Sequence, residues 1–338
     1  MSSTLRDVAR TANVSTATAS LVLNGKARRI SQETIQRVLA AAEALNYVPN
    51  RSAQSLVSGR RKIVALVMPE LENSFFSSLS NSIIPALQAA GYNVLMGISA
   101  NNAEEEKRLL EQMLGEGVAA LLLCTSSAKG SQIQEDICNL IRSARIPTVQ
   151  IDRKFELENS PCIYVDSFEG ARRLCKHLID EGYRRIAAIT GPPQQFSVTE
   201  RLRGYRYSLE EAGINYDEDL IYVGDYRVNS GYEAIPSLLP FRPDCIFAFN
   251  DMIALGALKA LGDLGKQVPQ DIALAGYDDN YYSPMLHVPI SSVRQPIEAV
   301  ASASVERLLA LIQKGKSPGL IEDLVLKPEL RIRQSSLS

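Results

Sequence analysis

Nine side chains that could bind a small ligand stand at or shortly after the ends of short apolar runs in this sequence. They are Asn73, Phe75, Phe76, Asp152, Arg153, Arg201, Asn250, Asp278 and Gln295. Planar amides, carboxylates and guanidiniums bond pairs of neighbouring hydroxyl groups, while aromatic rings pack on the C–H face of a sugar-like ring. These residue types therefore indicate a binding site for a small polyhydroxylated molecule.

The elements that must position these side chains begin at residue 63, where short apolar runs alternate with amphipathic stretches. We expect strands at 63–68, 93–98, 118–124, 147–151, 163–166, 185–190, 221–224, 245–250 and 272–277, and helices at about 75–90, 104–115 and 131–143. The alternation predicts an α/β body of two doubly wound parallel sheets, whose ligands bind at the carboxyl ends of the strands. A helix at 297–312 and a final strand at 324–330 would return the chain between the two halves, giving three crossovers that form a hinge.

Two pairs of these residues have structural alternatives. Phe75 and Phe76 could be plain core residues. Asp152 and Arg153 could form a structural ion pair instead of contacting a ligand.

Two further pairs of neighbours need separate roles. Asn250 and Asp251 could each cap the helix that follows, and we assign Asn250 to the ligand and Asp251 to the cap. Asp278 and Asp279 could suggest acid/base chemistry, but adjacent residues of a strand point to opposite faces.

The first 62 residues differ in charge from the rest of the chain. They hold ten lysines and arginines against three acids, a net charge of +7, whereas the whole 338-residue chain carries −2, which leaves −9 for the remainder. This asymmetry is expected if one end of the chain contacts nucleic-acid phosphates and the other does not.

An all-α unit is predicted inside this basic segment. Thr4 and Asp7 can form a capping box for a first helix, Asn13 suits a left-handed turn, and Ser15 can cap a second helix. Two short helices with so tight a turn make a helix-turn-helix. A third helix after Ser31 would complete the core with an apolar stripe formed by Ile35, Val38, Leu39, Ala42 and Leu45.

The start of the second helix of such a unit enters the major groove of DNA. This nominates Thr16, Ala17, Ser20 and Leu21. Ala17 and Leu21 cannot hydrogen-bond a base, so they would touch a thymine methyl or permit close approach, while hydroxyls reach base edges or phosphates.

The segment LRDVARTANVSTATASLVLNGKARRIS, with RVLAAAEALNYVPNRSAQSL after it, resembles the N-terminal signature of LacI/GalR repressors. The resemblance implies a dimer with two recognition helices in adjacent major grooves and paired hinge helices in the minor groove between them. It also implies that Leu56 wedges into a central base step, the alternative being a linker leucine packed on the body. The DNA-contacting residues that we assign are Thr4, Leu5, Ser15, Thr16, Ala17, Thr18, Ser20, Leu21, Asn24, Arg28, Tyr47, Asn50, Arg51, Ala53 and Leu56.

The body resembles the effector domain of the same family and the ribose-type periplasmic binding proteins. The nine residues named first each fall on a sugar-contacting position of the binding-protein pattern, which favours a small unphosphorylated monosaccharide. To them we add Gln195, Ser197 and Tyr226, where Tyr226 matches an aromatic wall or is a surface residue. Gln195 stands where the purine-responsive branch has an arginine, so a purine ligand is less expected.

These observations divide the chain into three parts. We expect a helix-turn-helix domain at 1–48, a linker with a short hinge helix at 49–61, and an effector-binding and dimerisation domain at 62–338. Within the last, an N-subdomain would span about 62–161 and 291–320, and a C-subdomain about 162–290 and 321–334. So short a hinge helix is marginal alone in water, so it would fold on DNA and melt away from it.

Other functional classes fit the sequence less well. No GxGxxG follows a strand, no P-loop is present, and His177 and His287 stand in no motif, so we predict neither an enzyme nor a cofactor. The five cysteines are scattered, which predicts buried thiols and neither disulfides nor a metal site. Without a membrane-length apolar run or a secretory segment, we expect a cytoplasmic protein.

We therefore predict a sequence-specific repressor of sugar-utilisation genes, released from a palindromic operator when a monosaccharide binds. The alternatives are a repressor that requires a phosphosugar or purine corepressor, an activator, and a sugar receptor without DNA function. The absence of a trailing leucine heptad favours a homodimer over a tetramer.

Overall fold

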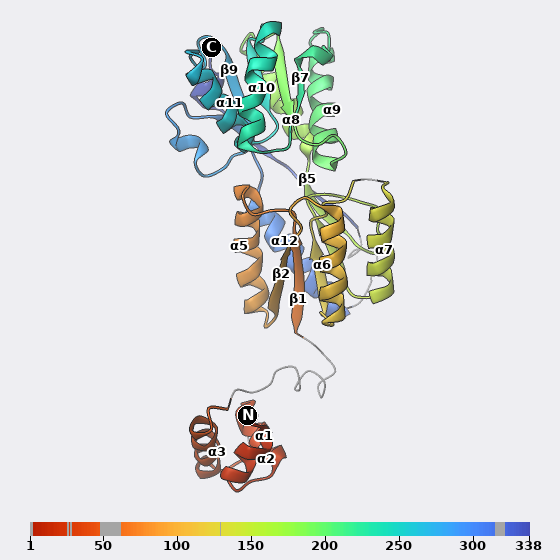
Figure 1. The fold of residues 1–338 in the computed structure, drawn as a ribbon, viewed down its shortest axis with the longest axis vertical. Coiled ribbons are helices and arrows are strands. Elements are labelled where there is room, and N and C mark those ends of the chain that lie inside the picture. The colour runs from red at the N-terminus through yellow and green to blue at the C-terminus, as the bar shows by residue number, and fades with distance from the viewer. Residues whose placement is uncertain (1–2, 26, 28, 48–61, 129, 315–321) are drawn as a thin grey trace. The chain divides into compact units, whose positions relative to one another are not determined.

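The computed structural model of this chain describes residues 3–25, 27, 29–47, 62–128, 130–314 and 322–338. The chain divides into two compact units, residues 1–61 and residues 62–338. Figure 1 traces both units with their elements labelled.

The first unit is the predicted helix-turn-helix. Its helices are α1 (Leu5–Thr11), α2 (Thr16–Leu23) and α3 (Gln32–Ala44). Thr4 and Asp7 form the expected capping box, with the Thr4 N–H donating to Asp7 Oδ2 at 3.0 Å. Asn13 has a φ of +50°, which makes the tight turn, and Ser15 Oγ accepts from the N–H of Thr18 to begin α2. Local sequence signals therefore define this unit.

A small apolar core holds the three helices together. Its fully or largely buried members are Val8, Ala9, Ala12, Ala19, Val22, Val38, Ala41 and Ala42. The predicted stripe of α3 needs one correction, because Leu39 is 51% exposed while Ala41 is buried. Leu39 therefore lies on the exposed side of α3.

The second unit contains two lobes, each built on a six-stranded sheet. The sheet of the first lobe has the order β11-β5-β4-β3-β1-β2, and every pairing in it is parallel. Its strands are β1 (Ile63–Met68), β2 (Asn93–Ile98), β3 (Ala120–Leu123), β4 (Thr148–Ile151), β5 (Cys162–Val165) and β11 (Leu324–Leu326). Its helices are α5 (Ser74–Ala89), α6 (Ala103–Gly115), α7 (Gln132–Ala144) and α12 (Ile297–Lys314). Helices α5 and α12 cover one face of the sheet, and α6 and α7 cover the other (Figure 1).

The second lobe repeats this arrangement. Its sheet has the order β12-β10-β9-β8-β6-β7, in which only the β10–β12 pair is antiparallel. Its strands are β6 (Ile186–Thr190), β7 (Ile221–Val223), β8 (Cys245–Ala248), β9 (Ala273–Asp278), β10 (Ser291–Arg294) and β12 (Glu329–Arg331). Its helices are α8 (Ser167–Asp180), α9 (Phe196–Glu211), α10 (Val228–Leu238) and α11 (Asp251–Asp263), with short 3₁₀ turns at Glu218–Leu220, Leu239–Phe241, Ser283–Met285 and Gln334–Ser336. The predicted pair of doubly wound sheets is confirmed.

The chain passes between the lobes at three places, as predicted, but not at the predicted residues. Strand β5, expected in the C-subdomain, belongs to the first lobe, and β10, expected in the N-subdomain, belongs to the second. Gln150 explains the first difference, because its amide bonds the Ser160 carbonyl and the Phe155 N–H and so folds residues 152–161 back beside β4. The predicted final strand is two strands, β11 and β12, one in each sheet.

The buried apolar residues of the chain form the cores of the first unit and of the two lobes. All five cysteines are buried, as predicted, and carry free thiols. Among the described residues, no helix is both long and apolar enough to cross a membrane.

Candidate ligand-binding site and DNA-contacting helix

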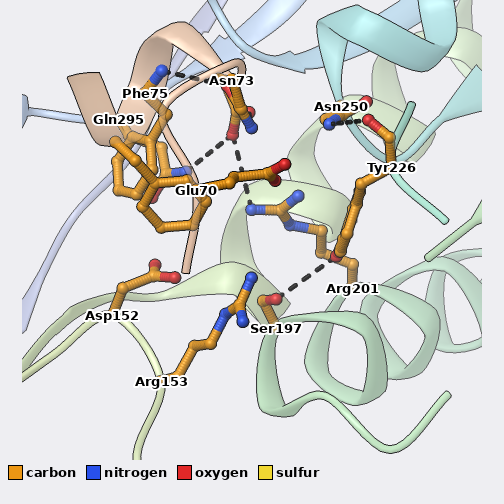
Figure 2. Close-up of a pocket in the computed structure, with 12 residues that line it drawn as sticks. Glu70, Asn73, Phe75, Asp152, Arg153, Ser197, Arg201, Tyr226, Asn250 and Gln295 are labelled. Carbon is orange, nitrogen blue, oxygen red and sulfur yellow. Dashed lines mark hydrogen bonds and ion pairs between the residues drawn. The ribbon is translucent and has the colours of Figure 1, made fainter. Parts of the chain in front are cut away.

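A small polar hollow lies in the second unit and is lined from both lobes. Its lining residues, shown as sticks in Figure 2, are Glu70, Asn73, Phe75, Phe76, Asp152, Arg153, Ser197, Arg201, Tyr226, Asn250, Asp278 and Gln295. Eleven of these twelve were predicted as effector-binding residues. They stand where β1, β4, β6, β7, β8, β9 and β10 end or shortly afterwards, as expected for ligands of doubly wound sheets.

Asp278 is the electrostatic centre of the hollow. Its Oδ1 accepts from Gln295 Nε2 at 2.8 Å, and its Oδ2 accepts from Asn73 Nδ2 at 3.2 Å. Burial raises the pKa of Asp278 to about 6, against the opposing effect of Arg201. Its φ of +98° turns the chain out of β9. Asp279 faces the other way and pairs with Arg294 and Arg333, so the two neighbours do not form an acid/base pair.

Arg201 on α9 places a buried cation beside this carboxylate. Its Nη2 lies 3.6 Å from Asp278 Oδ1, and Nη1 donates to the carbonyl of Phe249. The guanidinium carbon lies 3.6 Å from the centre of the Tyr277 ring. Stacking and pairing together fix the direction in which the remaining N–H groups point.

Asp152 and Arg153 line the hollow from the first lobe and do not pair with each other among the described ion pairs. Arg153 instead donates from Nη1 to the Asn101 side chain and to the carbonyl of Thr125, both at 3.1 Å, and lies over the Phe76 ring at 5.3 Å. Burial raises the pKa of Asp152. The structural ion-pair alternative is therefore wrong, and both side chains face the hollow.

Tyr226 forms part of the wall and is only 9% exposed, so the surface alternative is wrong. Its hydroxyl lies 3.3 Å from Ser197 Oγ (Figure 2). The ring packs against Gly191, where an added Cβ would approach ring carbons to 2.4 Å. A glycine at 191 is what lets the ring lie so close to the end of β6.

Asn250 takes the cap that we assigned to Asp251 and also keeps its place in the hollow, whereas Asp251 does neither. Asn250 is the cap of α11, because its Oδ1 accepts from the Ile253 N–H at 2.8 Å, while its Nδ2 donates to the Tyr226 carbonyl. It still lines the hollow. Asp251 lies behind the site, fully buried, and accepts from Ser292 Oγ, Ser283 Oγ and a backbone N–H. Both residue types cap helices well, so the sequence alone did not separate them.

Asn73, Phe75 and Phe76 all come from the start of α5. Asn73 caps this helix by accepting from the Phe75 N–H at 3.0 Å and also reaches Asp278 in the other lobe. The two phenylalanines line the hollow and at the same time belong to the core of the first lobe. The core and ligand interpretations therefore apply together.

Two residues of the site differ from the prediction. Gln195 begins α9 but is not among the lining residues. Glu70 was not predicted and lines the hollow; burial raises its pKa, opposed by a hydrogen bond with Asn101 and by the charge of Arg153. Glu70 lies two residues beyond the end of β1, where the sequence has no periodic pattern from which its position could be predicted.

Six of the ten described residues that we assign to DNA are exposed. On α2, Thr16, Ala17 and Leu21 are exposed, with Leu21 at 44%, and Ser20 is half-buried. Thr4, Ser15 and Asn24 are exposed, whereas Leu5 and Tyr47 pack partly against the core. Asn24 Nδ2 donates to the Ser20 carbonyl at 2.8 Å and so ends the helix. Thr18 is half-buried beside its cap. Arg28, Asn50, Arg51, Ala53 and Leu56 lie outside the described residues, as does the predicted hinge helix.

Known families match both units. The description "Bacterial regulatory proteins, lacI family" matches residues 4–50, and "Periplasmic binding protein-like domain" matches residues 175–336. The ribose operon repressor of Escherichia coli K12 is 33% identical over 337 residues, which cover 98% of this chain and 99% of the relative. The HTH-type transcriptional repressor PurR of Escherichia coli O139:H28 is 32% identical over 341 residues, covering 98% and 96%.

The fold has a close counterpart among solved structures. The lac repressor dimer bound to operator and the anti-inducer ONPF superposes with a TM-score of 0.86 and 27% identity, and the match covers 100% of both chains. The similarity therefore extends over the helix-turn-helix unit and over both lobes.

Proposed function

The chain belongs to the LacI family of bacterial regulatory proteins, and we propose that it represses sugar-utilisation genes until a small neutral monosaccharide binds between its lobes. It is a DNA-binding transcriptional regulator and not an enzyme. The effector is proposed to bind in the hollow around Asp278, and the operator against α2. The protein would act in the cytoplasm as a homodimer on a palindromic operator.

The main support for a polyhydroxylated ligand comes from buried polar atoms around the hollow that have no hydrogen-bond partner among the described residues. Arg153 Nε, Arg201 Nε and Gln295 Oε1 are buried and have no hydrogen-bond partner among the described residues. Leaving such an atom without a partner costs about 1–3 kcal/mol. Sugar hydroxyls both donate and accept, so one sugar could satisfy the guanidinium donors and the amide acceptor together.

The charges around the hollow favour a neutral sugar over a phosphorylated one. The carboxyl groups of Glu70, Asp152 and Asp278 outnumber the guanidiniums of Arg153 and Arg201. Arg153 already donates to a backbone carbonyl, and Arg201 lies beside Asp278. A phosphate group, which carries about −1.5 to −2 at neutral pH, would add negative charge to a site whose carboxyl groups already outnumber its guanidiniums.

One relative supports a sugar as the ligand, and another supports a purine. The ribose operon repressor is named for a sugar operon, whereas PurR is named for purines. A purine or phosphosugar corepressor is the second candidate. A ligand that favours the DNA-binding state of the protein strengthens operator binding, whereas a ligand that favours the other state weakens it. Gln195 stands where the purine-responsive branch has an arginine, and it lies outside the lining.

The proposed mechanism links closure of the lobes to release of DNA. Residues 49–61 would form paired hinge helices on the operator, with Leu56 in the minor groove. Sugar bound between the lobes would bridge residues such as Arg153 in the first and Arg201 in the second. This would shift the first lobes of the dimer relative to each other and separate the hinge helices.

A thermal-shift screen of the full chain tests the ligand class. The panel contains pentoses, hexoses, their phosphates, disaccharides and purines, since a ligand that binds only the native state raises Tm. A large shift with one free monosaccharide supports the proposal. Shifts confined to phosphosugars or purines would overturn the proposed ligand and leave the family assignment intact.

A further inference from the structure

Glu106 is a buried carboxylate that the proposed function does not use. It lies on α6, and none of its surface is exposed, although the neighbouring Glu104 is exposed and Glu105 pairs with Arg108 on the outer side. Burial raises the pKa of Glu106 to about 6. A buried carboxylate destabilises the fold unless its partners compensate, so its partners indicate its role.

The partners of Glu106 belong to the loop that follows β3. Its Oε1 accepts from Thr125 Oγ1 at 2.7 Å, and its Oε2 accepts from the backbone N–H of Ser126. The hydroxyl of Ser126 lies 2.6 Å from that of Ser99, which follows β2. Glu106 therefore fixes this loop from beneath the ends of two strands.

The same loop holds Arg153. The carbonyl of Thr125 accepts from Arg153 Nη1, and Asn101 Oδ1 accepts from the same nitrogen, both at 3.1 Å. Because these two acceptors share Nη1, the other guanidinium N–H groups remain for the hollow, including the unpartnered Nε. Thr125 connects Glu106 to Arg153, through its hydroxyl on one side and its carbonyl on the other. The charge of Arg153 also acts on Glu106 directly.

We propose that Glu106 is a positioning residue for the effector: it fixes residues 125–126 so that Arg153 presents its free N–H groups to the sugar. Glu106 is not among the residues that line the hollow, so it acts through Arg153. The inference rests on the proposed function, because it takes a sugar as the ligand of Arg153.

A double-mutant cycle on the full chain tests this link. Calorimetric titration with the sugar found in the thermal-shift screen gives Kd for Glu106→Gln, Arg153→Lys and the double variant. Glutamine keeps the shape of Glu106. Its NH₂ group, however, would face either the Thr125 hydroxyl or the Ser126 N–H, both of which now donate to the carboxylate. We expect Glu106→Gln to weaken sugar binding about tenfold. The double variant should bind no more weakly than Arg153→Lys alone, because both changes act on one contact.

Glu105→Gln is the matched control, since Glu105 is the adjacent carboxylate on the same helix and pairs with the exposed Arg108. It should leave Kd unchanged. Additive losses in the double variant, or unaltered affinity in a folded Glu106→Gln protein, would overturn the proposal. If Glu106→Gln fails to fold by circular dichroism, Thr125→Val replaces it in the cycle, because it removes the hydroxyl donor and keeps the carbonyl. Failure of the unaltered protein to bind any sugar would instead contradict the proposed function.

Discussion

Asn73 Nδ2 donates to Asp278 Oδ2 at 3.2 Å, which joins the start of α5 in the first lobe to the end of β9 in the second. A second contact lies beside it, where Ser74 Oγ donates to the side chain of Asn280, two residues beyond β9. The ligand site therefore lies beside direct bonds between the lobes. Any ligand that strengthens or replaces these bonds changes how the lobes sit together, which is the basis of the proposed switch.

Asn73→Asp should weaken sugar binding tenfold or more by titration calorimetry, because it places a second carboxylate against Asp278. The Tm should fall as well, because the two buried carboxyl groups repel each other in the folded protein, although aspartate still caps the helix as well as asparagine does. Asn102→Asp is the control, because Asn102 caps α6 and is not among the residues that line the hollow. Equal sugar affinity in both variants would show that the contact between the lobes is irrelevant to binding.

Arg201→Lys should abolish the sugar response and leave operator affinity within about twofold. Lysine keeps the charge but cannot stack flat on Tyr277 while also reaching Asp278 and a carbonyl. Sugar titrations monitored by operator binding measure this. Arg203→Lys controls for the helix, since Arg203 is an exposed residue of α9 that pairs with Glu200. A normal sugar response in Arg201→Lys would remove Arg201 from the site.

Sugar affinity should fall as the pH is lowered through about 6, where burial has placed the pKa of Asp278. Above that pH the folded protein holds Asp278 ionised, able to accept hydrogen bonds on both oxygens. Below it the carboxyl gains a proton and loses acceptor capacity and its attraction to Arg201. Titrations from pH 5 to 8 measure the profile.

The variant Asp278→Asn isolates this carboxyl, because asparagine tolerates the positive φ at 278. We expect weak binding and loss of the Asp278 step from the pH profile. A profile identical to that of the unaltered protein would assign the step to another group, such as Glu106, whose pKa burial also raises to about 6.

Leu21→Ala should lower operator affinity about tenfold without changing the slope of affinity against salt, because an apolar contact with base edges releases no counterions. Leu39→Ala is a matched control in the same unit, since Leu39 is an exposed leucine on α3. Anisotropy of a labelled operator at several salt concentrations measures both. Equal losses of operator affinity in the two variants would argue against α2 as the helix that contacts the bases.

Much of the site could be predicted from sequence because the parallel α/β pattern fixes where strands end. Arg201 and Gln295 lie far apart in the chain, yet both reach Asp278. Glu70 and Glu106 were missed for physical reasons. Glu70 follows Pro69 in a loop without periodicity, and Glu106 belongs to a run of glutamates that is typical of a solvated helix face, although it points inward.

The crossovers between the lobes could not be placed from local patterns. Strand β5 looks like the first strand of the next half, yet it pairs with β4, and the hydrogen bonds of Gln150 help to hold the chain between the two strands. The division of the last strand does have a signal, because Pro328 lacks the N–H that a continuous strand needs. Chain reversals of this kind depend on side-chain contacts that sequence periodicity does not report.

The most direct test of the proposed function is the affinity of the full chain for an operator with and without the sugar. A selected palindromic duplex is labelled, and its binding is followed by fluorescence anisotropy at fixed salt as the monosaccharide is added. We predict that saturating sugar weakens operator binding by tenfold or more, within the usual range of allosteric coupling. Operator affinity that rises with the sugar, or that does not change while the sugar is bound, would contradict induction by cleft closure.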